Sequence, residues 1–399
     1  MRQFEALKIT ELCSSALEKR YLVSSQNSFF EANQVMVDLL VCLRNARSKD
    51  SAILMFLSSY SCYNFTYDKV NDVIDRVIIP KLTNLPKTST RQFLYSKQIL
   101  TSEQVDCWSN KLVLLFNKHC IIVVFLCAII LDLLFFVEAP NLLVYHSSMS
   151  IFTILELLSF VLISSFIHEL GHASACKYCK VQHGGIGLGI YFNFPVLYTD
   201  VTQIWSLSRR KRCLVNVAGI YFQCILLIIL ICFYFICMID VLRYMVLVLN
   251  VSFFLTLNPF LKFDGYWLAT DILGVPNLHK RSKDLVKYIV LKVRRKTENE
   301  KPDLLRIGTK EKVAFFMYVI FVNVFMFYYL CYVIPRLSYT FLSDLPDEVV
   351  QLLTFMSNQA TPPFALVRNI FSQVMFLALV IYMLSSYGKY IIKKIKLKK

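Results

Sequence analysis

Residues 151–178 read IFTILELLSFVLISSFIHELGHASACKY, and this stretch indicates both the class of protein and the place of its chemistry. The stretch is longer than the about 20 residues that an α-helix needs to cross a bilayer, and its first half is almost entirely apolar. Three ionisable side chains, His168, Glu169 and His172, follow in its second half. Because such groups are costly to bury in a membrane, we expect them to have a task. The alternative is a polar cluster that only packs against a neighbouring helix.

Five further apolar runs lie on either side of this stretch, at 120–138, 213–238, 241–257, 313–334 and 366–387. The composition agrees with them, because 56% of the residues are hydrophobic and 18% are charged, whereas a soluble domain has about 25% charged residues. A disordered chain, a collagen-like chain and a disulfide scaffold are excluded, and an ordinary soluble enzyme is disfavoured. We predict a mainly α-helical, polytopic membrane protein with about six transmembrane helices.

The positive charge of the chain is concentrated in three blocks. The chain has 43 Lys and Arg against 27 Asp and Glu, a net charge of +16, and most of the excess lies in 209–212, 279–312 and 389–399. With six spans, all three blocks fall on the same side of the membrane as the N-terminus, which is typical of cytosolic segments. We therefore predict a multi-pass protein of the cell membrane with both termini in the cytosol. Contact with anionic lipid explains the blocks, so the predicted partner is the lipid bilayer and not a nucleic acid.

The composition divides the chain into five segments. They are a cytosolic α+β domain (1–110), a membrane core (120–278), a basic cytosolic loop (279–312), C-terminal transmembrane helices (313–388) and a basic cytosolic tail (389–399).

Within the first segment, residues 20–31 have the sequence of a β-hairpin, with two β-prone runs around a Ser-Ser-Gln-Asn-Ser turn. Residues 32–46 and 67–83 show apolar residues at helical spacing. These patterns predict a small, winged-helix-like α+β domain.

The pentapeptide HELGH at 168–172 matches the pattern H-E-x-x-H. On a helix, residues four apart share one face, so the two imidazoles could bind one Zn²⁺. The glutamate between them could then act as general base on a water at the metal, whose pKa zinc lowers towards about 7. A catalytic zinc also needs a third protein ligand. Asp264 is the best candidate, although an Asp-Gly pair after a helix is also a common turn.

These motifs resemble the site-2 protease family of intramembrane zinc metalloproteases. The strongest likeness is to the peptide zinc metalloproteases that occur with ribosomally made, modified peptides. It rests on HELGHASACKYCKVQHGGIGLGIYFNFPVLYTD at 168–200 and LNPFLKFDGYWLATDILGVPNL at 257–278, and it covers roughly 150–280 of the chain.

The resemblance implies a role for particular residues of the membrane core. His168, His172 and Asp264 would be the zinc ligands, and Glu169 the general base. Asn258 would orient the substrate carbonyl or stabilise the oxyanion.

One stretch departs from the family pattern. Many members have Gly-Pro and Asn in the third span, where this chain has AGIYFQ at 218–223. Gln223 could replace the Asn as a hydrogen-bond donor to substrate, or it could be a neutral packing residue.

Residues 184–203 (GGIGLGIYFNFPVLYTDVTQ) are predicted to form an amphipathic hairpin at the membrane interface. They resemble the family's membrane-associated β element beside the active site. An edge strand there could hold a peptide extended by strand addition, and a purely structural re-entrant turn is the alternative. Similarly, the N-terminal hairpin followed by helices resembles a PqqD-like peptide-binding domain, although a generic regulatory domain would also fit.

Three functions remain open at this point. The first is an intramembrane zinc metalloendopeptidase acting on a small peptide precursor or a membrane-associated protein. The second is a non-catalytic membrane partner for peptide export or immunity that retains a zinc site, and Glu169 argues against it because a structural zinc needs no general base. The third, a transporter, fits poorly because the six spans show no internal repeat.

Overall fold

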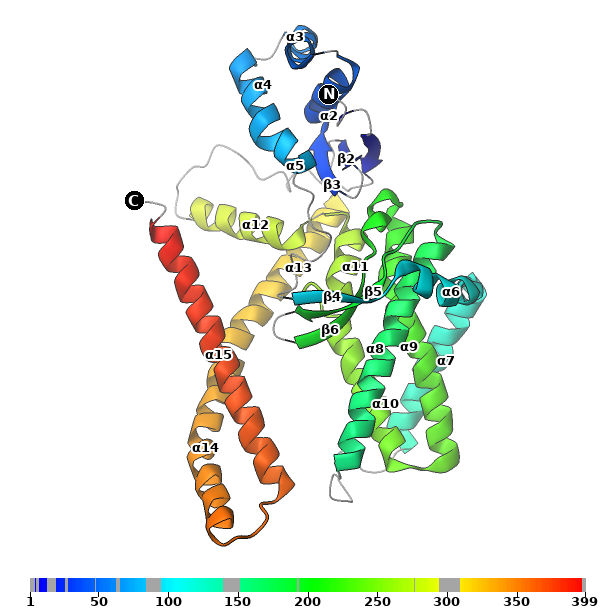
Figure 1. Cartoon of the computed structure of the whole chain (residues 1–399), viewed down its shortest axis with the longest axis vertical. Coiled ribbons are helices and arrows are strands. Elements are labelled where there is room, and N and C mark those ends of the chain that lie inside the picture. The colour runs from blue at the N-terminus through cyan, green and yellow to red at the C-terminus, as the bar shows by residue number, and fades with distance from the viewer. Residues whose placement is uncertain are drawn as a thin grey trace. The chain divides into compact units, whose positions relative to one another are not determined.

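Helices make up most of the chain in the computed structural model, which divides into two units, Met1–Phe315 and Phe316–Lys399 (Figure 1). The structure describes residues 4, 7–12, 19–25, 28–46, 48–61, 65–83, 95–138, 151–191, 194–275, 277–293 and 309–396. The predicted loop at 139–150 and most of the basic loop after residue 293 lie outside these residues.

A small α+β region begins the first unit, as predicted. Its strands β1 (Lys8–Leu12), β2 (Arg20–Ser25) and β3 (Ser28–Asn33) form an antiparallel sheet in the order β1-β2-β3. Its helical part consists of α2 (Gln34–Asn45), α3 (Lys49–Ser59), α4 (Tyr67–Val73), a π-helical turn (Ile74–Ile78) and α5 (Ile79–Thr83). The Asn33 side chain caps α2 by accepting from the Met36 N–H. The core contains Val23, Leu40 and Phe56.

Helices form most of the remaining chain. The first unit contains α7 (Lys118–Glu138), α8 (Ile151–Tyr178), α9 (Arg209–Cys237), α10 (Asp240–Thr256), α11 (Asp264–Leu273) and α12 (Leu278–Val293). A further helix, α13 (Thr309–Tyr328), bridges the boundary between the units, and a π-helical turn (Tyr329–Val333), α14 (Ile334–Ser357) and α15 (Phe364–Lys396) complete the second.

Five helical stretches in the described part of the chain are long and apolar enough to cross a membrane, where about six were predicted. They are Lys118–Glu138, Ile151–Tyr178, Arg209–Cys237, Glu311–Ser357 and Phe364–Ser385. The remaining predicted span, at 241–257, forms the helix α10. This helix has 17 residues and is shorter than the five stretches. A connecting loop was expected over 335–365, but α14 continues the preceding helix to Ser357. Polar residues interrupt the apolar run there without interrupting the helix.

Helix α9 is the centre of the first unit, and α7, α8, α10 and α11 all pack against it. Two glycines bring α8 and α9 together. A Cβ on Gly171 would lie 2.4 Å from the Ala218 carbonyl oxygen, and one on Gly219 would lie 2.4 Å from the His168 ring. Small residues of this kind allow close approach of helices in membranes. The close approach buries the C-terminal half of α8, whereas its N-terminal half is largely exposed.

A second antiparallel sheet lies beside α8. The predicted hairpin forms β5 (Ile186–Tyr191) and β6 (Phe194–Thr199), and β4 (Tyr95–Leu100) adds a third strand in the order β4-β5-β6. Strand β6 therefore forms one edge of this sheet.

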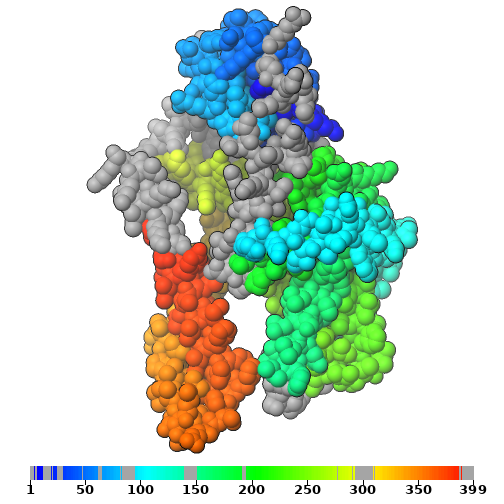
Figure 2. Space-filling model, viewed as in Figure 1, coloured from blue at the N-terminus to red at the C-terminus, as the bar shows by residue number. Residues whose placement is uncertain are grey.

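Helix α6 (Ser102–Leu112) follows β4 and packs on α8. Figure 2 shows this segment (cyan) lying across the green part of the molecule. Its Asp106 carboxylate pairs with Lys177 at 2.7 Å and with His183 at 2.9 Å.

Candidate metal centre

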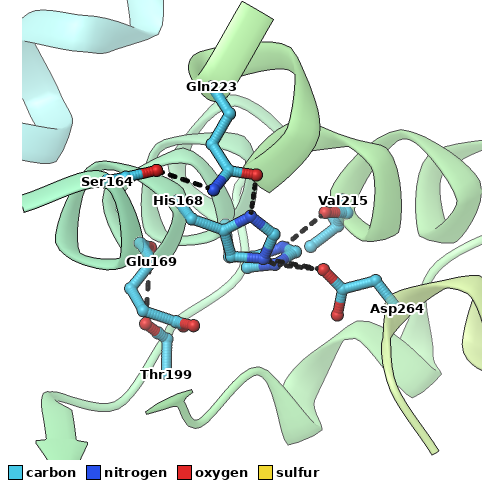
Figure 3. Close-up of polar contacts among 8 residues, drawn as sticks. Ser164, His168, Glu169, Thr199, Val215, Gln223 and Asp264 are labelled. Atoms are coloured by element: carbon cyan, nitrogen blue, oxygen red, sulfur yellow. Dashed lines mark hydrogen bonds and ion pairs between the residues drawn. The ribbon is translucent and has the colours of Figure 1, made fainter. Parts of the chain in front are cut away.

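Three side chains converge where α8 meets the start of α11. The Nε2 atoms of His168 and His172 lie 3.0 Å apart, and the Asp264 Oδ2 lies 2.8 Å from the first and 3.0 Å from the second (Figure 3). The two histidines are one helical turn apart on α8, so their common face follows from the helix itself. Asp264 comes from 96 residues beyond His168, and only the packing of α11 brings it here.

Each histidine is held by a contact on its other ring nitrogen. His168 Nδ1 lies 3.1 Å from the Gln223 side-chain oxygen, and His172 Nδ1 lies 2.8 Å from the Val215 carbonyl oxygen. Because both partners are acceptors, each Nδ1 carries the hydrogen and donates it. Both Nε2 lone pairs are thereby left facing Asp264, which is the arrangement that metal-ligating histidines adopt.

Gln223 is itself fixed in orientation. Its amide nitrogen donates to the Ser164 hydroxyl at 3.0 Å, so its oxygen is the atom presented to His168. Ser164, Gln223 and His168 are buried. The structure therefore adds a contact with a candidate metal ligand to the substrate contact and the neutral packing considered from sequence, and Gln223 also lines the cavity beside the site.

The turn before α11 explains how Asp264 reaches the histidines. The Asn258 side-chain oxygen accepts from the Phe260 N–H at 2.8 Å, which closes a turn after α10. A Cβ on Gly265 would lie 2.1 Å from the Leu257 carbonyl oxygen, so only glycine fits at the start of α11. Asn258, expected to contact substrate, thus has its side-chain oxygen in the turn.

The charge state of Asp264 suits a metal ligand. Burial alone would raise the pKa of its carboxyl, but the positive charge that the His172 and His168 imidazoles carry when they are protonated, together with their hydrogen bonds, holds that pKa well below its usual range. A bound metal ion would supply the positive charge in place of those protons. The carboxyl is therefore ionised and can act as a ligand without first losing a proton.

The three atoms fit a zinc ion. Tetrahedral zinc bonds imidazole nitrogen and carboxylate oxygen at about 2.0–2.2 Å, which separates neighbouring ligands by about 3.2–3.5 Å. The observed separations of 2.8–3.0 Å need to open by only a few tenths of an ångström. No fourth His, Cys, Asp or Glu joins the group in the described part of the chain, so one position is left for water or substrate, as in catalytic sites.

Glu169 lies beside the three ligands on the wall of a cavity of about 410 Å³. The residue is 8% exposed, and the Thr199 hydroxyl donates to its backbone carbonyl at 3.3 Å. Figure 3 shows the Glu169 side chain next to Thr199, on the opposite side of His168 from Gln223. Strand β6 forms another part of the cavity wall, and its residues 195–199 all line it.

Sequence reasoning missed the contacts that orient the ligands, namely those of Ser164, Val215 and Gly219. A signal for them exists on α9, where Arg212, Asn216, Gly219 and Gln223 recur at helical spacing. A polar stripe on an apolar helix indicates a face that contacts polar partners, but the sequence does not show which residues these partners are.

Replacing Gln223 with leucine should weaken zinc binding about 10- to 100-fold, because the His168 ring loses the acceptor that fixes its orientation. Competition with a chromophoric chelator on the detergent-solubilised protein measures this change. Gln373, another buried glutamine, lies on α15 and provides a matched control. An unchanged zinc affinity in Gln223→Leu would remove the orienting role from this contact.

No protein-family model, curated protein or solved structure matches the chain, so its function is inferred from the site.

Proposed function

We propose that the chain is an intramembrane zinc metalloendopeptidase of the site-2 protease type, with the shorter helix α10 as a sixth crossing and both termini in the cytosol. One observation carries the proposal: the ligand triangle of His168, His172 and Asp264 shares a cavity with the Glu169 carboxylate and with a strand at the edge of a sheet. Metal ligands, a candidate base and a surface for an extended peptide are the three parts that peptide hydrolysis requires.

Strand β6 is the proposed binding surface for the peptide. Pro195 has no N–H and pairs with Ile190, so this pair cannot be one that exchanges two hydrogen bonds. Alternation along the antiparallel ladder then turns the N–H and C=O groups of Leu197 and Thr199 away from β5, towards the free edge. A peptide added there would be extended, and its amides would be exposed to attack, unlike those of a helix.

The chemistry of the site is divided between the metal and Glu169. A zinc ion held by the three ligands would lower the pKa of a bound water and polarise the scissile carbonyl. The Glu169 carboxylate would take one proton from the attacking water and deliver it to the leaving amine nitrogen. The carbonyl carbon gains a bond to the water oxygen and loses its bond to nitrogen. The second proton of the water passes from the new carboxylic acid to the amine, so the products are a carboxylate and an ammonium group.

The N-terminal α+β region is proposed to hold a precursor peptide, as PqqD-like domains do. Its strands β1 and β3 are the edges of a separate three-stranded sheet, and such edges accept an added strand. A small precursor peptide delivered from the cytosol is therefore the proposed substrate class.

The proposal is tested with the purified, zinc-loaded protein in detergent and a peptide library prepared from a bacterial proteome. We expect new peptide termini to appear by mass spectrometry, to disappear when a chelator removes the metal, and to return on addition of Zn²⁺. Zinc binding without any new termini would favour a non-catalytic partner that retains the metal.

Leu197→Pro should lower kcat/KM for a cleaved peptide about tenfold or more, because it removes the N–H that faces the free edge and leaves a substrate carbonyl without its donor. Leu197→Val keeps that N–H and is the control. Zinc affinity should be unchanged in both. Equal kcat/KM values for the two variants would exclude strand addition at Leu197.

A further inference from the structure

Residues on one face of α9 contact both His168 of the candidate metal centre and the helix α11, which carries Asp264. Arg212, Asn216, Gly219 and Gln223 follow one another at spacings of four, three and four residues, so they form one stripe along the helix. The last two contact His168 on α8. The first two contact Asp271, which lies on α11 and not on α8.

Both carboxylate oxygens of Asp271 are engaged by this stripe. Arg212 Nε donates to Oδ1 at 2.5 Å, and Asn216 Nδ2 donates to Oδ2 at 2.8 Å. The three residues are between 3% and 6% exposed, and we call them the α9–α11 clasp. Arg209 extends it, because its Nε donates to the Asp271 backbone carbonyl at 2.9 Å.

The clasp and the metal ligand belong to the same rigid helix. Asp271 is seven residues after Asp264, which is about two helical turns, so both carboxylates lie on nearly the same face of α11. A displacement of α11 from α9 at Asp271 must therefore displace Asp264 from the two histidines. The Asn258 turn leads into the start of α11, and the clasp holds the same helix to α9 nearer its other end.

We propose that Arg212, Asn216 and Asp271 are positioning residues whose function is to place the Asp264 carboxylate within reach of the two histidines. This inference rests on the proposed function only in that the three ligands bind zinc. The role of the clasp is to fix geometry, because the attraction within a buried ion pair is largely offset by the free energy of removing its charges from water. What such a pair provides is one fixed arrangement of two helices.

The test measures the metal site itself in the full-length, detergent-solubilised protein. Asp271→Ala should raise the zinc dissociation constant about 10- to 100-fold. Cobalt replaces zinc in such sites, and its visible absorption follows the number and geometry of its ligands. We expect the cobalt spectrum of Asp271→Ala to move towards that of Asp264→Ala.

A control and a rescue separate positioning from general loss of structure. Asp106→Ala removes another partly buried ion-pair carboxylate, one that joins α6 to α8, and should leave zinc affinity and the cobalt spectrum unchanged. The exchange Asn216→Asp with Asp271→Asn keeps the charge and both hydrogen bonds of the clasp, and should restore zinc binding to within a few-fold of the original protein.

The zinc affinity and the cobalt spectrum distinguish the possible outcomes. Wild-type zinc affinity and cobalt spectrum in Asp271→Ala would overturn the inference, and if that variant does not fold, the milder Asn216→Ala is judged by the same two measurements. Failure of the unsubstituted protein to bind zinc would instead overturn the proposed function.

Discussion

Replacing Glu169 with glutamine should reduce peptide hydrolysis about 10²- to 10⁴-fold while leaving zinc bound. The amide has nearly the shape of the carboxylate but cannot accept the proton of the attacking water. The three proposed ligands, His168, His172 and Asp264, are untouched by the change, so the zinc dissociation constant should stay within a few-fold. The expected signature is therefore loss of kcat without loss of metal.

Expression of both proteins in the native host, followed by comparison of small peptides by mass spectrometry, measures this effect and identifies the substrate at the same time. A precursor should accumulate with Glu169→Gln, and its fragments should appear only with the unsubstituted protein. Glu156→Gln is the matched control, because Glu156 lies on the same helix α8 and is exposed. Full activity in Glu169→Gln would end the general-base mechanism.

Replacing Asp264 with alanine should weaken zinc binding more than about 100-fold, beyond the effect of losing a residue that only orients a ligand. The change removes the one ionised ligand of the group and leaves the two imidazoles, which are neutral when they bind a metal. Hydrolysis should be lost together with the metal, in contrast to Glu169→Gln. Raising the zinc concentration should restore part of the binding.

Metal analysis after dialysis against a dilute chelator provides the measurement. Asp284→Ala is a suitable control, because Asp284 is an exposed aspartate of the nearby helix α12. Stoichiometric zinc in Asp264→Ala at wild-type affinity would show that the third ligand is another group and that the approach of Asp264 to the histidines has a different role.

The sequence determined the features that depend on local periodicity. The long apolar runs, the hairpin at 184–203 and the capped helix after Asn33 all appear where their residue patterns predict them. Likewise, residues four apart on one helix share a face, so the pairing of His168 with His172 followed from spacing alone.

Two features of the observed fold differ from the sequence predictions, because local periodicity does not determine them. No span was predicted between 334 and 366, yet residues 334–357 form a helix, because a helix tolerates polar residues on a face away from its neighbours. Strand β4 joined the hairpin as a third strand, and no periodicity within residues 95–100 names the strand with which it pairs.

Only the tertiary structure decided which distant side chains meet. Gln223 contacts His168, Asn258 closes a turn, and Asp271 is held by α9, which lies far from it along the sequence. The physical reason is that periodicity tells which face of a helix is polar but not which neighbour that face meets. The choice of neighbour depends on how closely two helices approach, and here two glycines, Gly171 and Gly219, bring α8 and α9 together and place the His168 ring against α9.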